Sequence, residues 1–148
     1  MLQLIQYKPP RIAMGLVVVA TATNALLSLT LHASLAAAAT VTAVLGFSLM
    51  IRAWWLFKQA RTAICPTHAA TFLVTDDVYA ITRNPMYLGI FLMLTGLAMA
   101  TGSAAFYVAA ITYAVVMDRV FCVYEEQKSL HEFGDDYLDY ARRVRRWI

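Results

Sequence analysis

Four long apolar stretches divide the chain, and short polar connections separate them. The first covers Ile12 to Leu31 and the second Leu35 to Phe57. The third covers Met86 to Thr101 and the fourth Ser103 to Val123. Each is close to the ~20 residues that a helix needs to cross ~30 Å of hydrocarbon. The pattern therefore predicts an all-α integral membrane bundle of four transmembrane helices.

Two further segments are more polar but keep apolar residues. The loop from Lys58 to Asn84 is long for so small a protein, and its apolar content argues against disorder. We expect this loop to fold back against the helices at the membrane surface. After Val123, apolar residues recur at helical spacing, with a break at Gly134. We interpret this tail, which ends in the basic and aromatic residues 142–147, as a C-terminal amphipathic helix on anionic headgroups.

Composition supports the membrane interpretation. Hydrophobic residues make up 61% of the 148 residues and charged residues 14%, whereas a soluble domain averages about half apolar and about a quarter charged. The length allows a single domain, residues 1–148. The net charge of +3 is modest, and no basic run alternates with aromatic residues, so we expect no nucleic-acid partner.

The distribution of cations predicts the orientation. All 12 Lys and Arg residues lie in the N-terminal arm, between Arg52 and Arg83, or from Arg119 onward. The connections at residues 32–34 and 101–103 carry none. Because positive residues stay on the cytoplasmic side, both termini and the central loop are expected there. The connections on the other side are short, which predicts two tight antiparallel hairpins.

A first polar cluster lies at the start of the third apolar stretch. Asn84 suits the N-cap position and Pro85 the first helical position, so a helix is expected to begin there. Its first backbone amides, beside Arg83, would suit a small carboxylate or phosphate. The alternative is a capped helix end with Arg83 among lipid headgroups.

A second cluster lies near the end of the fourth stretch. Asp118 and Glu125 are seven residues apart, as are Arg119 and Glu126, so each pair is expected to share a helix face. Ionisable groups at membrane depth are expensive and mark functional sites. The alternative is a set of intrahelical ion pairs that anchors the helix end.

Other residues suggest packing rather than chemistry. The three histidines have no metal-ligand spacing to one another, and the two cysteines form no CxxC motif, so no metal site is expected. Gly89 and Gly96 share one helix face and predict close helix packing.

Taken together and in order, these motifs resemble the isoprenylcysteine carboxyl methyltransferase and phospholipid methyltransferase superfamily. The matching text runs from residue 71 to residue 147. It contains Arg-Asn-Pro-Met-Tyr-Leu-Gly at 83–89, Glu125-Glu126, Phe-Gly-Asp-Asp-Tyr-Leu-Asp-Tyr at 133–140, and Val-Arg-Arg-Trp at 144–147. The resemblance implies a methyltransferase that uses S-adenosylmethionine and acts on a lipophilic small-molecule or lipidated acceptor.

The resemblance also implies a set of site residues. The cofactor contacts carried over are Thr71, Phe72, Leu73, Val74, Tyr79, Asn84, Pro85, Met86, Tyr87 and Glu125. The candidate catalytic residues are Arg83, Glu126 and Arg119. A carboxylate acceptor needs no base, whereas an amine or thiol does, and Glu126, Asp118 or His131 would supply it.

Two positions depart from the superfamily pattern. Many relatives have Gly shortly before the Tyr79 position, where this chain has Asp77 and Val78. The prenylcysteine enzymes place a substrate-binding Arg four residues before Glu125, and this chain has Phe121 there.

We therefore expect an enzyme of the bacterial inner membrane whose active site faces the cytoplasm, with the acceptor entering from the bilayer. Its other partners would be membrane lipids, and the sequence leaves the oligomeric state open. The competing hypotheses are a non-catalytic membrane scaffold or subunit that keeps the fold, and a small membrane reductase.

Overall fold

The structure, a computed structural model, describes residues 9–27, 36–60 and 71–148. Within them the chain is all-α and contains no strand. The first two helices are α2 (Pro9–Leu27) and α3 (Ala36–Gln59), and a short 3-10 helix, η1 (Asp77–Ala80), follows. The remaining elements are α4 (Pro85–Thr101), α5 (Ala104–Val116), the π-helix η2 (Met117–Cys122), α6 (Val123–Phe133) and α7 (Asp135–Arg143).

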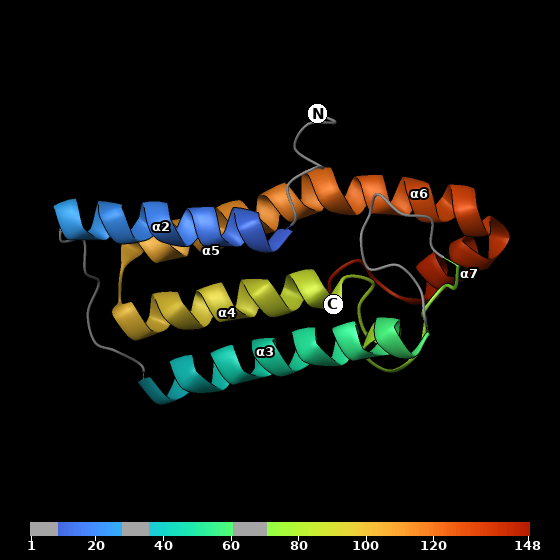
Figure 1. Ribbon diagram of the computed structural model, residues 1–148, viewed down its shortest axis with the longest axis horizontal. Helices are drawn as coiled ribbons and strands as arrows, with labels where there is room; N and C mark the ends of the chain where they lie inside the picture. The colour runs from blue at the N-terminus through green and yellow to red at the C-terminus, as the bar shows by residue number, and fades with distance from the viewer. Residues whose placement is uncertain (1–8, 28–35, 61–70) are drawn as a thin grey trace.

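The helices lie along the long axis of the molecule, as Figure 1 shows. α3 and α4 pack side by side, and α5 and α2 cover the other face of α4. The turn between α4 and α5 is tight because Gly102 adopts φ 59°, the left-handed conformation that a glycine takes without strain. The predicted third-to-fourth hairpin is thereby confirmed. The connection at 32–34 lies outside the described residues, as do Cys65 and His68.

The contact between α3 and α4 depends on small residues. A Cβ atom added to Gly46 would lie 2.5 Å from the carbonyl oxygen of Gly89, and one added to Gly89 would lie 2.5 Å from that of Gly46. Gly96 approaches the backbone of Ala39 in the same way. The predicted close packing at Gly89 and Gly96 is confirmed.

The helix that contains the fourth apolar stretch continues beyond Val123, where the sequence changes from apolar to polar. α5, η2 and α6 follow one another without a break as far as Phe133, and α6 projects beyond the bundle (Figure 1). The helix continues because residues 124–132 hold no Gly or Pro, and it stops at Gly134, where φ is 54°. The predicted break at Gly134 is confirmed.

The tail differs from the prediction after Arg143. α7 ends there, and residues 144–147 form a non-helical segment with bends at 144 and 146, which we call the C-terminal strap. The strap returns to the start of α4 instead of continuing along a membrane surface (Figure 1). Its buried Val144 packs with Tyr137 and Tyr140, so the burial of one apolar side chain competes with further helix.

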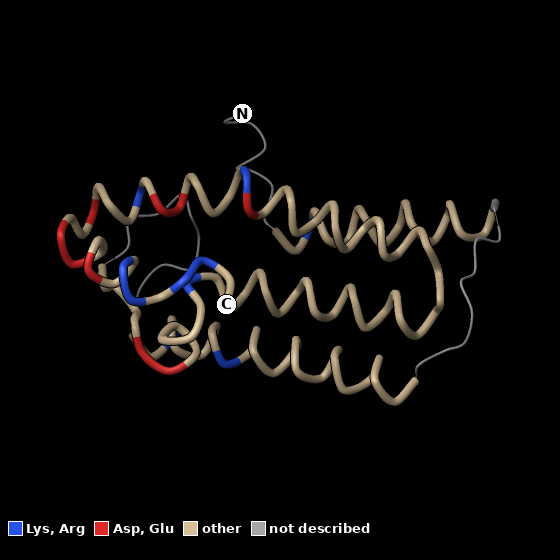
Figure 2. The backbone as a smooth tube through the Cα atoms, turned by 180° about the vertical axis from the view of Figure 1, so that it is seen from behind, with Lys and Arg blue, Asp and Glu red and all other residues tan. Residues whose placement is uncertain are grey.

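The described residues show a membrane-type surface. Two helical stretches are long and apolar enough to cross a bilayer, Ala36–Gln59 and Ala104–Phe133, and α4 is apolar but has 17 residues. Large apolar side chains of α2, α3 and α5, such as Val18, Phe47 and Ile111, are exposed. Figure 2 shows charged residues gathered at the end that holds α6 and α7. These features indicate an integral membrane protein.

A candidate active site at the charged end of the bundle

A cavity of about 670 Å³ opens at the charged end of the bundle. Its walls come from the loop before α4, the first turn of α4, α3, α6 and α7, with the start of α2 at one edge. Segments far apart in sequence therefore meet at one place. A volume of this size is in the range that binds small ligands.

Most residues singled out from the sequence line this cavity. The cofactor contacts among them are Phe72, Leu73, Val74, Tyr79, Asn84, Pro85, Met86, Tyr87 and Glu125. Arg83 and Glu126 of the candidate catalytic set also line it. Thr71 is not part of the lining. Arg119 is not either, because its side chain is 80% exposed and its guanidinium lies 3.4 Å from Asp118, away from the cavity.

A direct hydrogen bond joins the start of α4 to α6. The hydroxyl of Tyr87 donates to Oε1 of Glu125. Tyr87 is buried, and its ring meets that of Phe121 edge-on at 6.4 Å between centroids. Phe121 is fully buried in the apolar core, so no charged group replaces the missing arginine at this position.

The first turn of α4 presents backbone amides to the cavity. Pro85 occupies the first helical position, as predicted. The backbone amide of Leu88 donates a hydrogen bond to the carbonyl of Asn84 at 3.0 Å. The amides of Met86 and Tyr87 precede that bond and lie outside the hydrogen-bond ladder of the helix. Asn84 occupies the N-cap position but its side chain makes no capping bond. Its Nδ2 donates instead to the carbonyl of Arg146, because the strap lies against it.

Arg83 is held by two groups at the edge of the cavity. Its Nη2 lies 3.2 Å from Oε1 of Glu126, and its Nη1 donates to the hydroxyl of Tyr137 at 3.0 Å. Its backbone amide donates to the carbonyl of Arg145 in the strap. The side chain of Arg83 is 16% exposed, so it borders the cavity without facing bulk solvent.

Arg146 of the strap bridges two carboxylates of the long helix. Its Nε and Nη2 donate to the two oxygens of Glu126 at 2.8 and 2.6 Å, a bidentate pair. Its Nη1 donates to Oδ1 of Asp118 at 3.0 Å, and Nε1 of Trp147 donates to the same oxygen at 2.9 Å. These contacts fix the strap against η2 and α6.

The π-helix decides which acidic residues share a face. In a regular α-helix about 100° separates successive residues, so Asp118 and Glu126, eight apart, would lie roughly 80° from each other around the axis. η2 turns less per residue because its hydrogen bonds span five residues. Asp118 therefore reaches Arg146 together with Glu126, whereas Glu125 bonds Tyr87. The seven-residue spacing predicted that Asp118 and Glu125 share a helix face, whereas in the structure Asp118 shares the partner Arg146 with Glu126.

Sequence reasoning missed one wall of the cavity. Lys128, Ser129 and Glu132 of α6 line it, with Nζ of Lys128 3.7 Å from Oε1 of Glu132. They follow Glu125 by three, four and seven residues, the spacing of one helix face. That spacing was the signal available in the sequence, but only the apolar positions after Val123 were used to predict the helix, and the polar positions on the face of Glu125 were overlooked.

Aromatic residues close the cavity beside α7. The hydroxyl of Tyr140 donates to the carbonyl of Tyr79 at 2.8 Å, and the ring of Tyr79 meets that of Phe57 at 5.5 Å. Burial raises the pKa of Tyr79 and of Tyr140 above the usual value. Both hydroxyls therefore stay protonated, and the loop at 71–84 is fixed against α3 and α7, as expected for a loop that folds back.

The opposite wall is apolar. Met50, Ile51 and Trp54 of α3 face Ile90 of α4, and Pro9 and Pro10 at the start of α2 form an edge. The cavity therefore has a polar side, formed by α6 and Arg83, and an apolar side toward the transmembrane helices. An amphipathic ligand matches such a division.

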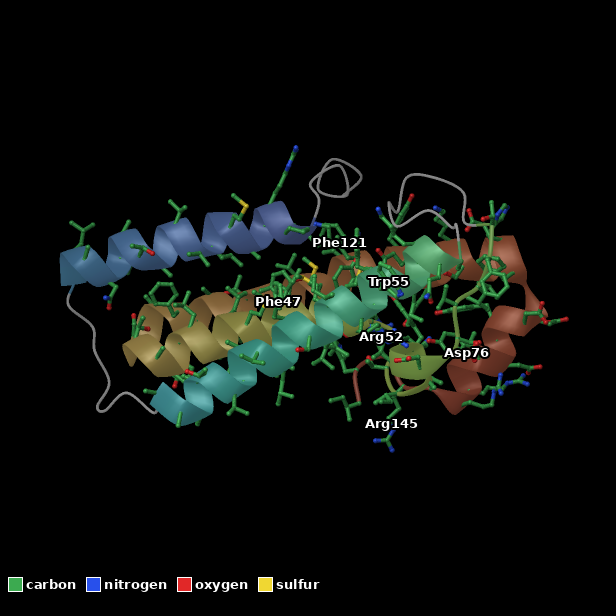
Figure 3. All side chains as sticks on the ribbon, turned by 60° about the horizontal axis from the view of Figure 1, so that its bottom comes forward. Phe47, Arg52, Trp55, Asp76, Phe121 and Arg145 are labelled. Carbon is green, nitrogen blue, oxygen red and sulfur yellow. The ribbon has the colours of Figure 1, made fainter. Side chains whose placement is uncertain are left out.

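The departure at Asp77 preserves the local backbone. Asp77 has φ 61°, in the left-handed region that glycine prefers and that Asp tolerates. A Gly in relatives and an Asp in this chain are thus compatible with the same turn. Asp77 adds an ion pair, since its Oδ2 accepts from Nη2 of Arg52 at 2.5 Å (Figure 3 labels Arg52).

The model of the phospholipid methyltransferase family matches residues 34–136 of the chain. This range includes the first turn of α4, Glu125 and all of α6. It stops before most of α7 and before the C-terminal strap.

Three relatives are similar to part of the chain. The protein-S-isoprenylcysteine O-methyltransferase of Schizosaccharomyces pombe is 33% identical over 75 residues, which are 49% of this chain and 30% of that protein. Protein-S-isoprenylcysteine O-methyltransferase B of Arabidopsis thaliana is 37% identical over 75 residues, which are 36% of that protein. An uncharacterized protein of Haemophilus influenzae is 30% identical over 63 residues, its whole length. The chain thus spans about a third of the length of the two curated enzymes. No solved structure gives a significant match.

Proposed function

The chain belongs to the phospholipid methyltransferase family, and from this membership and the cavity we propose that it is a methyltransferase of a lipophilic acceptor. The methyl donor in this proposal is S-adenosylmethionine. The observation that carries the proposal is the hydrogen bond from Tyr87 to Glu125, which brings the two sequence clusters to one cavity.

The residues of the cavity fit this donor. The amides of Met86 and Tyr87 would bind its carboxylate at the start of α4. Glu125 would accept a hydrogen bond from its ribose or its amino group. The rings of Tyr79 and Tyr87 would border its positive sulfur, because an aromatic face attracts a cation.

When bound, S-adenosylmethionine supplies a methyl group activated by a positive sulfur. The chain itself needs to hold donor and acceptor in line and to exclude water, since positioning is the main contribution to such a displacement. The buried rings of Tyr79 and Tyr87 exclude water from the inner end of the cavity. The side chain of Arg83 is held by Glu126 and Tyr137, and it places a positive charge at the edge of the cavity.

The apolar side of the cavity supports a lipidic acceptor. Met50, Ile51 and Trp54 would contact its hydrocarbon part, and its head would lie among the polar residues of α6. We propose that it enters from the bilayer between α3 and the start of α2. Two of the predicted bases, Glu126 and Asp118, accept hydrogen bonds from Arg146.

We place the charged end of the molecule at the cytoplasmic face and propose four membrane spans. α2 and α4 would cross together with the two longer apolar stretches, and the charged residues of α6 and α7 would lie at the headgroups. The absence of Lys, Arg, Asp and Glu from residues 12–27, 36–51 and 84–117 supports this arrangement.

The test uses the full chain purified in detergent. Titration calorimetry with S-adenosylhomocysteine, the demethylated product, is expected to show one site per chain. Incubation with methyl-labelled S-adenosylmethionine and a membrane lipid extract is expected to label a lipid-soluble product. The proposal fails if the folded protein neither binds the product nor labels any component of the extract.

A further inference from the structure

The C-terminal strap touches every element that carries the polar side of the cavity. The carbonyl of Arg145 accepts from the amide of Arg83 at 3.0 Å. The carbonyl of Arg146 accepts from Oγ1 of Thr82 at 3.1 Å and from Nδ2 of Asn84 at 3.0 Å. The strap is thus hydrogen-bonded to the residues immediately before α4.

The other side of the strap is fixed by charge. The guanidinium of Arg146 forms a fork with Glu126 on α6 and reaches Asp118 in η2. Trp147 adds a bond to Asp118 and packs against the buried core that contains Tyr87. The strap therefore connects the start of α4 to the long helix. This connection adds to the direct hydrogen bond between α4 and α6 that Tyr87 and Glu125 form.

Arg146 also orients the carboxylate of Glu126, which lies beside the cavity. Oε1 of Glu126 accepts from Arg146 and lies 3.2 Å from Nη2 of Arg83. A carboxylate held by a bidentate arginine has one orientation, and a planar guanidinium provides this geometry where an ammonium does not. With Glu126 fixed, Arg83 is fixed as well.

We propose that the strap is a clasp, which holds the start of α4 against η2 and α6. Arg146 is the positioning residue of this clasp. It orients Arg83, Glu126 and the first turn of α4 for ligand binding without touching the ligand. Arg146 is not part of the cavity lining. The proposal rests on the proposed function for the identity of the ligand, whereas the clasp itself rests on the hydrogen bonds alone.

The neighbouring arginine gives a matched control. Arg145 is exposed, and Figure 3 shows its side chain pointing away from the bundle. Arg145→Gln removes the same charge from the same segment but leaves the fork intact. Arg146→Gln removes the fork, and Arg146→Lys keeps the charge without the planar geometry. Asp118→Asn, outside the cavity lining, is a milder variant that weakens the same clasp.

The first measurement is hydrogen exchange of the Arg83 amide in the detergent-purified full chain, which needs no ligand. We expect exchange to be at least about tenfold faster in Arg146→Gln, intermediate in Arg146→Lys, and unchanged in Arg145→Gln. Unchanged exchange in folded Arg146→Gln would overturn the clasp. Should that variant not fold, Asp118→Asn is expected to give a severalfold faster exchange, and no change there would overturn it.

The second measurement is the dissociation constant for S-adenosylhomocysteine. We expect it to rise about tenfold in Arg146→Gln and to stay unchanged in Arg145→Gln. Faster exchange with unchanged affinity would disprove the positioning role. If the wild-type chain binds no S-adenosylhomocysteine, the proposed function fails, and the exchange measurement still decides whether Arg146 holds the strap.

Discussion

Tyr87 and Glu125, 38 residues apart in sequence, are joined by a hydrogen bond at the inner end of the cavity. Tyr87 lies in the first turn of α4, and Glu125 lies on α6, beyond the π-helix. The ring of Tyr87 is buried against Phe121, and Glu125 is half-buried on the polar side of the cavity. The hydroxyl and the carboxylate satisfy each other here, and a ligand would compete for the same oxygen atoms.

Glu125→Ala is expected to weaken S-adenosylhomocysteine binding by about tenfold to a hundredfold, because hydrogen bonds to a charged group contribute about 1.5–3 kcal/mol. Tyr87→Phe removes the hydroxyl that donates to Glu125 but leaves the carboxylate in place, so it should weaken binding less than Glu125→Ala does. Calorimetry on the purified variants measures both. Asp136→Ala, at an exposed carboxylate on α7, is the control, and an unchanged constant in Glu125→Ala would contradict the placement of the donor.

Much of the site was predictable because it depends on local signals. Arg83, Asn84 and Pro85 mark a helix start in any context, and Glu125 is one of few acidic residues beside an apolar stretch. The convergence of these two clusters on one cavity was predicted from the family resemblance and is found in the structure. The close approach at Gly89 likewise follows from a residue type that permits it.

The remainder depends on long-range contacts that no local pattern contains. A π-helix has no sequence signature of its own, so the side on which Asp118 lies was misjudged. The composition of residues 144–147 suggests a continued helix, yet they leave the helix because Arg146 bonds Glu126 and Asp118 and Val144 packs with Tyr137 and Tyr140. Such partners become visible only once the chain has folded.

Two substitutions at Asp77 separate backbone strain from its ion pair. Asp77→Ala and Asp77→Gly both lose the pair with Arg52, but only the glycine adopts φ 61° without a Cβ penalty. We expect Asp77→Ala to be about 1 kcal/mol less stable than Asp77→Gly. Thermal unfolding in detergent measures the difference. Equal stability of the two variants would show that the turn changes its conformation.

The same ion pair predicts a dependence on pH. The hydrogen bond from Arg52 holds the pKa of Asp77 below its usual range. A carboxyl whose pKa is lower in the folded state contributes stability above its unfolded pKa of about 4 and loses it as pH falls through the lower value. Unfolding between about pH 6 and 3 should therefore depend less on pH in Asp77→Asn than in the wild type. Since the pair is exposed, the difference will be small.

Tyr140→Phe tests how η1 is held against α7. The buried hydroxyl of Tyr140 donates to the carbonyl of Tyr79, and its loss leaves that oxygen without this partner. We expect about 1 kcal/mol lower stability and faster amide exchange in residues 76–82. Tyr124→Phe is the control, because Tyr124 has no side-chain hydrogen bond within the described part of the chain. Equal exchange in both variants would contradict the role of the Tyr140 hydroxyl.

Gly89→Ala tests the contact between α3 and α4 on which the cavity depends. A methyl group at Gly89 would lie 2.5 Å from the carbonyl oxygen of Gly46 and about 3 Å from Met50, so the two helices have to separate. We expect a loss of about 1–3 kcal/mol, the usual cost of an overpacked core. Because Met50 and Tyr87 both line the cavity, S-adenosylhomocysteine binding should weaken as well.

Gly15→Ala is the matched control for that substitution. No atom lies within 4 Å of a Cβ at Gly15 on α2, and alanine favours a helix over glycine by about 1 kcal/mol. The same chemical change should therefore leave stability unchanged or raise it. Thermal unfolding of both variants in one detergent compares them directly. If Gly89→Ala were as stable as Gly15→Ala, then α3 and α4 would not be in backbone contact, and the wall that Met50, Ile51 and Trp54 give to the cavity would have to lie elsewhere.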